Sequence, residues 1–304
     1  MENSKNLFVA VTGRANAGKS SLVNKLIGTK VAIVSPKPQT TRTRINGVIT
    51  KGDTQYVFID TPGMHRANSK LSGNMLKQIS AGVSDVDVAL LLFDCTKRFS
   101  EAERRLLQSM QKENVPCVLV INKADLLHDK GELLPLIERL KNEYDFADII
   151  PMSVRTGANL NALLPALDRF ATEGEHPFPV DLATDQSEKF FLSELVREKL
   201  LYAMDEEIPH GIAVFVETIA DAATNKGEPI VDIGFVIVCD KDSHKGMVIG
   251  KKGDNLKNVG TRARADIENY FGCKANIKLF VKVKEDWRNN DKFLTELGLS
   301  GNQS

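Results

Sequence analysis

The eight residues from Gly13 to Ser20 have the residue types and spacing that a phosphate-binding loop needs. They match the pattern G-x-x-x-x-G-K-S and lie between an apolar run at residues 7–11 and a helix-like stretch at residues 21–27. Glycines let backbone N–H groups wrap a phosphate, and the following helix turns its positive end towards it. Lys19 then reaches the outer phosphates, and the Ser20 hydroxyl can hold Mg²⁺. An ordinary glycine-rich turn would not account for both flanks, so the loop indicates a nucleoside triphosphate.

A second polar cluster, Asp60-Thr-Pro-Gly63, follows the apolar run at residues 56–59. A carboxylate at a strand end beside the phosphate loop can hold Mg²⁺ through water, and the Gly63 N–H can approach a terminal phosphate. The same four residues also occur in ordinary turns, so this assignment depends on the neighbouring clusters. We expect the phosphates and the metal to be bound by Gly13, Asn16, Ala17, Gly18, Lys19, Ser20, Ser21 and Asp60.

A third cluster, Asn122-Lys-Ala-Asp125, ends the apolar run at residues 116–121. The carboxylate of Asp125 can accept both the N1–H and the 2-amino protons of guanine, a donor pair that adenine lacks. A buried site built on such bonds rejects the wrong base by roughly 10⁴-fold, because its polar groups would be left unpaired. Alone, the four residues could merely cap the next helix. Three clusters in this order, each after an expected strand, favour a guanine nucleotide.

Length and composition allow a globular protein of two domains. The chain has 304 residues, of which 42% are hydrophobic and 26% charged. Because no run approaches about 18 apolar residues and no leader-like segment opens the chain, we expect a cytoplasmic protein. The four cysteines stand singly, as reduced thiols do. Residues 241–284 contain eleven Lys or Arg and four Asp or Glu, a net charge of +7 in a chain of net charge zero. This excess of positive charge favours binding of a polyanion.

Short apolar runs alternate with helical patterns over residues 1–171, which predicts an α/β domain with a mostly parallel sheet. Residues 45–50 and 56–60 are joined by a short turn containing Gly52 and Asp53, so they should form a hairpin that adds one antiparallel strand. The other strands are expected at residues 7–12, 88–94, 116–122 and 149–152. Residues 172–187 have no periodicity and should form an interdomain linker.

The order of elements after residue 187 predicts a second, α+β domain over residues 188–304. Helices are expected at residues 188–204, 255–271 and 291–297, and strands at residues 212–220, 230–239 and 275–284. The Gly250-Lys-Lys-Gly253 turn lets a nucleic-acid backbone approach two lysines. Outlying lysines such as Lys282 and Lys284 are interpreted as a solvated cationic face.

The three nucleotide clusters together resemble those of the translation-factor-like GTPases, which implies a P-loop GTPase domain. The resemblance implies that the polar loop at residues 37–42 is a switch whose Thr41, in preference to Thr40, joins Mg²⁺ in the triphosphate state. A plain polar loop is the alternative. It further implies that guanine is read by Asn122, Lys123 and Asp125 and backed by Ser153 and Val154, although the family usually has alanine at the place of Val154.

Met64 stands where many of these GTPases have a glutamine that orients water. We therefore expect hydrolysis to rest on positioning and charge stabilisation by Lys19, Thr41, Mg²⁺ and the Gly63 N–H. The substitution resembles a branch of the family in which an asparagine, here Asn16, holds K⁺. A local hydrogen bond within the loop is the other role open to Asn16.

The second domain resembles a KH domain of the second topological type, which clamps about four single-stranded nucleotides. We expect RNA to be bound by Ile249, Gly250, Lys251, Lys252 and Gly253. Ile249, Leu256 and Val259 are candidates for the apolar groove, although residues at such spacing also form cores.

The two domains in this order, with the segments Gln39-Thr-Thr-Arg42 and Met247-Val-Ile-Gly250, resemble a family of bacterial ribosome-assembly GTPases. The resemblance implies GTP and GDP as ligands and the 3′ end of 16S rRNA and the 30S subunit as partners, with no DNA. It also implies peripheral attachment at the inner face of the cell membrane, for which no strong amphipathic basic helix is visible.

The expected function is a GTP-hydrolysing switch that binds small-subunit rRNA and acts in 30S assembly. One alternative is a GTPase that assists tRNA modification, which would share the Thr-Thr-Arg loop but would not need the basic domain. Another is an RNA-binding assembly protein whose nucleotide pocket is only structural. The presence of Lys19, Ser20, Asp60 and Asp125 argues against the latter.

Overall fold

The computed structural model describes residues 4–63, 71, 86–127, 129–204, 211–223 and 227–300. The chain divides into two compact units. The first contains Met1–Ala32, Thr41–Ala67 and Ser72–Asp185, and the second contains Ile33–Thr40, Asn68–Leu71 and Gln186–Ser304. Met64 lies outside the described residues. Within the described ranges, every helix is too short or too polar to cross a bilayer.

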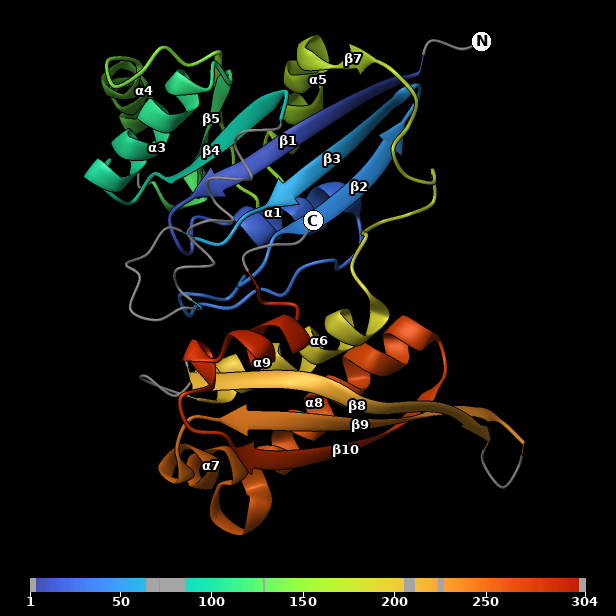
Figure 1. Cartoon of the computed structure of the whole chain (residues 1–304). Helices are drawn as coiled ribbons and strands as arrows, with labels where there is room; N and C mark the ends of the chain where they lie inside the picture. Colours follow the sequence, from blue (N-terminus) through green and yellow to red (C-terminus); the bar gives the residue numbers. More distant parts are fainter. Residues whose placement is uncertain are drawn as a thin grey trace. The chain divides into compact units, whose positions relative to one another are not determined.

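The first unit contains a mostly parallel sheet of order β2-β3-β1-β4-β5-β6 (Figure 1). The parallel strands are β1 (Lys5–Gly13), β3 (Thr54–Asp60), β4 (Val88–Asp94), β5 (Cys117–Asn122) and β6 (Asp148–Pro151). β2 (Ile45–Lys51) runs antiparallel to β3 and forms the expected hairpin. The expected strands are thus confirmed, with ends that shift by at most two residues.

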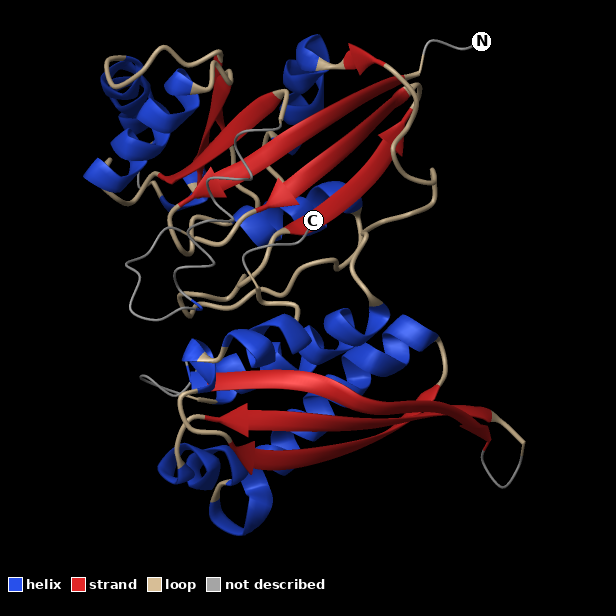
Figure 2. Ribbon diagram, in the orientation of Figure 1, coloured by secondary structure: helices blue, strands red, loops and turns tan. Residues whose placement is uncertain are grey.

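Helices cover both faces of this sheet (Figure 2). α1 (Lys19–Ile27) and α5 (Leu163–Leu167) pack on one face, and α3 (Glu101–Lys112) and α4 (Leu133–Lys141) pack on the other. Residues of β4 alternate between the two cores, as period-2 side chains of a strand buried on both faces must. Because β1, β3 and β5 are parallel, the loops that follow them leave the same edge of the sheet, where the three polar clusters can meet.

The segment at residues 172–187 packs on this sheet. β7 (Thr172–Glu173) pairs antiparallel with β1, and the backbone of Phe178 exchanges two hydrogen bonds of 2.9 Å with the side chain of Gln55. The N–H of Val48 in the edge strand β2 donates to the carbonyl of Ala183. These contacts give partners to edge backbone groups. The sequence predicts only a linker here, because its glycine, prolines and polar residues show no periodicity.

The second unit has an α+β fold. β8 (Ile212–Ala223) pairs antiparallel with β9 (Pro229–Cys239), which pairs parallel with β10 (Lys274–Val283). Side chains of α6 (Glu188–Ala203), α7 (Asp242–Ile249) and α8 (Asp254–Phe271) share one core with this sheet. On the other face, Phe293 of α9 (Asp291–Glu296) contacts Phe215 of β8. The order α-β-β-α-α-β-α contains the three helices and three strands expected from the sequence, together with one further helix, α7.

Candidate functional site

The loop after β1 has the backbone conformation that a phosphate-binding loop requires. Gly13, Asn16 and Gly18 have positive φ angles of 138°, 63° and 106°. A Cβ atom on Gly13 would lie 2.5 Å from the carbonyl oxygen of Leu92, and one on Gly18 would lie 2.3 Å from the Asn122 side chain. Glycine is therefore required at both positions by conformation and by space. Because Gly18 is the N-cap of α1, the loop leads directly into a helix N-terminus.

Lys19 is held within this loop. Its side chain is buried, and Nζ donates to the carbonyl oxygens of Gly13 and Arg14 at 3.2 and 3.1 Å. Burial lowers the pKa of Lys19, and the negative charge of Asp60 opposes that shift. The amino group of Lys19 thus sits inside the turn of backbone that we expect to bind phosphate.

Three oxygen-bearing side chains from separate segments meet at the start of α1. Ser20 Oγ donates to Asp60 Oδ2 at 2.6 Å, and Thr41 Oγ1 lies 2.9 Å from Ser20 Oγ and 3.3 Å from the same carboxylate oxygen. Asp60 Oδ1 is buried and has no hydrogen-bond partner among the described residues. Burial raises the pKa of Asp60, while Lys19, Ser20 and Thr41 act to lower it. This oxygen-rich set, with one buried carboxylate oxygen unpartnered, fits Mg²⁺.

Thr40 and Thr41 have different surroundings although they are adjacent. The Thr40 hydroxyl donates to the carbonyl of Lys37 at 2.6 Å and lies 2.7 Å from Ser35 Oγ. Thr41 is buried and is the threonine that lies with the other expected metal ligands. Thr40 belongs to the second compact unit, where its carbonyl accepts a hydrogen bond from Arg197 of α6.

The segment after β3 closely approaches the phosphate-binding loop at Gly63. A Cβ atom on Gly63 would lie 2.9 Å from Cα of Ala15 and 3.0 Å from its nitrogen. Thr61 Oγ1 also donates to the carbonyl of Val11 at 3.0 Å. The second polar cluster and the loop therefore meet, as the sequence predicts, and glycine is the residue that allows the contact.

Asn122 connects the two ends of the expected nucleotide site. Its Nδ2 donates to the carbonyl of Ala17 at 2.8 Å, and its Oδ1 accepts from the N–H of Val154 at 3.0 Å. The amide therefore fixes the phosphate-binding loop to the loop that begins at Ser153, and this positioning role is visible only in the structure.

Lys123 forms an ion pair of 2.6 Å with Asp94 at the end of β4. Burial would raise the pKa of Asp94, but hydrogen bonds from Lys123 and Thr96 lower it overall. Sequence reasoning missed Asp94. The available signal was its position, because it ends β4 as Asp60 ends β3.

Both carboxylate oxygens of Asp125 accept hydrogen bonds from the loop after β6. Oδ1 accepts from the hydroxyl of Ser153, and Oδ2 accepts from Nε and Nη2 of Arg155 at 3.0 and 2.6 Å. The bond from Ser153 is the main reason that the pKa of Asp125 is lowered, so the group stays an acceptor at neutral pH. The Arg155 side chain is 74% exposed and pairs with the carboxylate oxygen that we expect to accept from guanine.

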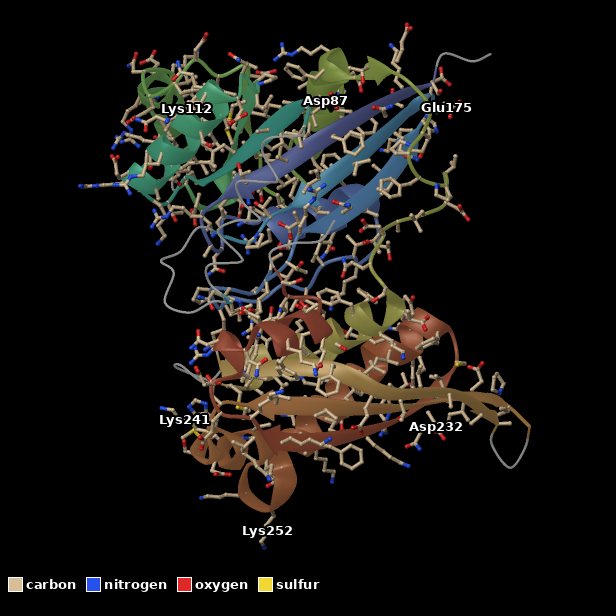
Figure 3. All side chains as sticks on the ribbon, in the orientation of Figure 1. Asp87, Lys112, Glu175, Asp232, Lys241 and Lys252 are labelled. Carbon is tan, nitrogen blue, oxygen red and sulfur yellow. The ribbon has the colours of Figure 1, made fainter. Side chains whose placement is uncertain are left out.

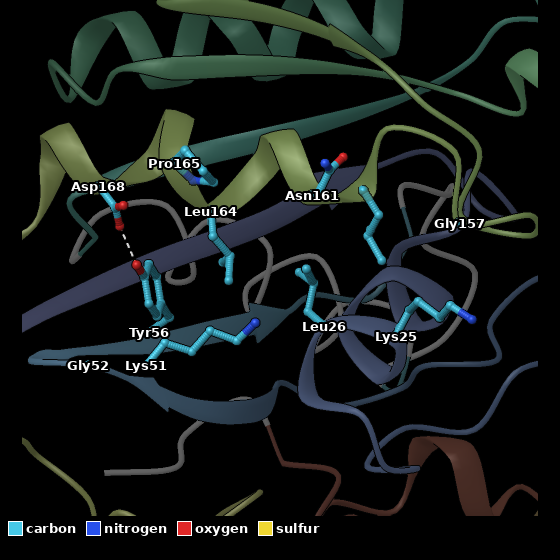
Figure 4. A pocket seen from close by; sticks show the side chains of 11 residues that line it. Lys25, Leu26, Lys51, Gly52, Tyr56, Gly157, Asn161, Leu164, Pro165 and Asp168 are labelled. Atoms are coloured by element: carbon cyan, nitrogen blue, oxygen red, sulfur yellow. Dashed lines mark hydrogen bonds between the residues drawn. The ribbon is translucent and has the colours of Figure 1, made fainter.

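A cavity of about 730 Å³ lies elsewhere in the first unit, between α1, the β2–β3 turn and the α5 region (Figure 4). In the wall of the cavity, the Tyr56 hydroxyl donates a hydrogen bond to the Asp168 carboxylate. The pKa of the Tyr56 phenol is raised, mainly by burial and further by this hydrogen bond. None of the sequence-predicted site residues lines it. Its lining residues are Lys25, Leu26, Lys51, Gly52, Tyr56, Gly157, Leu160, Asn161, Leu164, Pro165 and Asp168.

The Gly250-Lys-Lys-Gly253 turn joins α7 to α8. Gly250, Lys252 and Gly253 have positive φ angles of 75°, 53° and 86°. A Cβ atom on Gly250 would lie 2.8 Å from the Asn255 side chain, whereas one on Gly253 would meet no described atom within 4 Å. Lys251 and Lys252 are exposed, and Figure 3 shows Lys252 projecting outward from the tip of the turn. The turn thus presents charge on an open surface.

The apolar candidates around this turn divide into two groups. Val259 is buried in the core of the unit, so its role as a groove residue is not supported. Ile249 and Leu256 are half-buried and remain candidates.

Comparison with known proteins decides the family. A model of the 50S ribosome-binding GTPase family matches residues 8–123, and a KH domain model matches residues 207–288. GTPase Era of Clostridioides difficile (strain 630) is 42% identical over 294 residues, which cover 97% of this chain and 98% of that protein. The chain belongs to the Era family of GTPases. GTPase Era of Alkaliphilus metalliredigens (strain QYMF) is 43% identical over 97% of this chain and 98% of its own.

Solved Era structures share the whole fold. One, in complex with MgGDPNP and nucleotides 1506–1542 of 16S ribosomal RNA, has a TM-score of 0.93 and 34% identity over 98% of this chain and 99% of that one. A variant of Aquifex aeolicus Era bound to GDP·AlF4⁻ has a TM-score of 0.92 and 34% identity, and the match covers 97% of this chain and 99% of that one. The P-loop GTPase domain and the KH domain are confirmed, and as an Era GTPase the protein hydrolyses GTP.

Proposed function

We propose that this Era GTPase is a nucleotide-dependent switch that binds the 3′ end of 16S rRNA through its KH domain and acts in assembly of the 30S subunit. The meeting of Ser20, Thr41 and Asp60 beside a complete phosphate-binding loop, in a chain with a basic KH turn, carries the proposal. A solved Era structure contains both MgGDPNP and 16S rRNA nucleotides. Membership of the Era family also favours this function over a GTPase that assists tRNA modification.

In the proposed site Mg²⁺ is held by Ser20, Thr41 and Asp60. The ion neutralises charge on the phosphates, and Thr41 joins it only in the triphosphate state. Lys19 binds the outer phosphates, and the Gly63 N–H contacts the terminal phosphate. Because the described motif residues include no general base, positioning and charge stabilisation supply the rate.

K⁺ bound at Asn16 stays a prediction. Its test is GTP turnover in matched sodium and potassium buffers. A clearly higher rate in potassium supports the ion, and equal rates remove it.

Guanine recognition in this proposal rests on the Asp125 carboxylate. Ser153 holds one oxygen in place, and Arg155 must release the other when the base arrives. An exposed ion pair contributes at most about 1 kcal/mol. Breaking the Arg155–Asp125 pair therefore costs less free energy than two hydrogen bonds from guanine to the carboxylate contribute. Lys123 and Val154 complete the base end, and Asn122 positions it.

The nucleotide state is proposed to act through residues 28–44 and the segment after Asp60. Thr41 lies with the expected metal ligands while the carbonyl of Thr40 is bound by Arg197, so neighbouring residues of one loop belong to different compact units. We retain 1–171, 172–187 and 188–304 as the proposed domain division and the cytoplasm as the proposed location. Membrane attachment and the absence of DNA binding stay predictions.

The test is equilibrium binding of a labelled 3′-terminal 16S rRNA fragment to wild type, Gly253→Asp and Gly272→Asp. Both glycines have a left-handed conformation and open space for a side chain, but Gly272 follows the far end of α8. We expect Gly253→Asp alone to lose RNA binding, with GTP turnover unchanged in both variants. Equal RNA affinity in all three proteins would contradict the proposal, and absence of turnover in wild type would favour a structural nucleotide pocket.

A further inference from the structure

One aromatic side chain stands exposed on the face of the KH sheet opposite the α6–α8 core. In β10, Ile277 belongs to that core, so by strand alternation Lys278, Phe280 and Lys282 lie on the other face. Phe280 is 48% exposed, and both lysines are exposed. β10 contains three lysines and no acidic residue. An exposed phenylalanine between two lysines is not what a merely solvated cationic face needs.

Phe280 lies on the exposed edge strand of this face, whereas Val236 beside it in the central strand is buried. Register places Phe280 beside Val236, and Lys278 beside Gly234, in the central strand β9. A Cβ atom on Gly234 would lie 2.5 Å from the hydroxyl oxygen of Thr218 in β8, so glycine makes room for this exposed hydroxyl. Glycine in a strand interior often marks such a close approach. The result is an aromatic ring, an ammonium group and a hydroxyl on one patch of sheet.

Charge on this patch is only partly neutralised. Lys282 forms an exposed ion pair of 3.1 Å with Glu217, and Asp232 stands in register with Asn276 near the start of β10. Lys278 faces Gly234 in register, so no acid lies directly opposite it across the strand pair. The patch therefore keeps a cation next to an aromatic ring, the combination that binds single-stranded nucleic acid.

The strand that carries this patch lies next to the proposed RNA-binding turn, and the patch is on the face of β10 opposite the helices that the turn joins. β10 is the edge strand that packs against both α7 and α8, the two helices joined by that turn. Figure 1 shows α7 beside the carboxyl end of β10, and Phe280 lies three residues before that end at Val283. A KH turn clamps about four nucleotides. The RNA in the Era complex spans nucleotides 1506–1542, so most of such an RNA lies beyond the clamp.

We infer that the exposed face of β10 is a second RNA-contact surface, on which Phe280 stacks a base and Lys278 meets a phosphate. This inference rests on the proposed RNA-binding function. It adds a surface outside the Gly250–Gly253 turn that takes single-stranded RNA running past the edge of the sheet.

The experiment compares two labelled RNAs from the 16S 3′ end by fluorescence anisotropy, one of about four and one of about twelve nucleotides. The variants are Phe280→Leu, which keeps an apolar side chain but loses the aromatic face, and Lys278→Gln. Tyr202→Leu is the matched control, because Tyr202 is an exposed aromatic residue of the same unit, 52% exposed on α6. GTP turnover and thermal unfolding verify that each variant is folded.

We expect Phe280→Leu to weaken binding of the longer RNA about fivefold or more, the low end of the effect of losing base stacking. The short RNA should bind as in wild type. Lys278→Gln should weaken the longer RNA and reduce the slope of log affinity against log salt by about 0.7. Tyr202→Leu should bind both RNAs as wild type does.

Two outcomes overturn the inference while leaving the proposed function intact. In the first, Phe280→Leu and Lys278→Gln bind the longer RNA with wild-type affinity, whereas Gly253→Asp binds neither RNA. The other is equal weakening of both RNAs by Phe280→Leu, which would place its effect on the turn itself. If wild type binds neither RNA, the proposed function and this inference fail together.

Discussion

The two neighbouring threonines of the switch loop give a sharp test of the nucleotide site. Thr41→Val removes a buried hydroxyl that lies 2.9 Å from Ser20 Oγ and 3.3 Å from Asp60 Oδ2. Valine has nearly the same shape, and the 2.6 Å bond between Ser20 and Asp60 remains, so the fold should persist. Thr40→Val is the matched control, because it removes the adjacent hydroxyl, which is bonded within its own loop.

The magnitude follows from the charge of the partners. A hydroxyl contact with a charged group is worth about 1.5–3 kcal/mol, which corresponds to about 10- to 150-fold. We expect Thr41→Val to slow single-turnover GTP hydrolysis by that factor and to weaken binding of a GTP analogue, with GDP affinity unchanged. Thr40→Val should hydrolyse GTP at close to the wild-type rate.

The assay is single-turnover hydrolysis of labelled GTP, with GDP and GTP-analogue affinities measured by fluorescence titration. Equal slowing by the two variants would refute the distinction between the threonines. Wild-type hydrolysis by Thr41→Val would refute the role of Thr41 as a triphosphate-state ligand.

Three further predictions concern the base and the loop. Asp125→Asn replaces one acceptor with a donor and should shift preference from guanosine to xanthosine nucleotides, losing about 10²-fold or more in GDP affinity by competition titration; retained guanine preference would contradict the role of Asp125. Arg155→Ala removes a competitor for Asp125 and should tighten GDP binding by up to about fivefold, whereas weaker binding would show that Arg155 supports the base. Gly13→Ala places a Cβ atom 2.5 Å from the Leu92 carbonyl oxygen at φ 138° and should destabilise the first unit by about 1–3 kcal/mol in denaturant unfolding, which an unchanged midpoint would rule out.

The parallel sheet could be predicted because its strands are buried on both faces. β4 is a continuous apolar run that ends at Asp94. Such a run predicts where the strand begins and ends, and it predicts that the strand lies in the middle of the sheet. β7 could not be predicted, because two polar residues pair with β1 only through backbone groups that leave no trace in side-chain pattern. The packing of the following segment depends on Gln55, whose amide serves as a backbone substitute.

The candidate site was predictable in its residue types more than in its contacts. Spacing alone places Ser20 after the loop that follows one strand and Asp60 at the end of another, and the loops of parallel strands share one edge. It cannot orient adjacent side chains, so the difference between Thr40 and Thr41 comes from the structure. The bridging amide of Asn122 is likewise a three-dimensional fact, because its partners lie 105 and 32 residues away.

The most direct test of the central claim is the affinity of wild-type protein for the 3′-terminal 16S rRNA fragment in the presence of GDP and of a non-hydrolysable GTP analogue. We predict tighter RNA binding with the analogue, because Thr41 then joins the metal and changes the switch loop. Equal affinity in the two nucleotide states would contradict the claim that nucleotide and RNA sites are coupled.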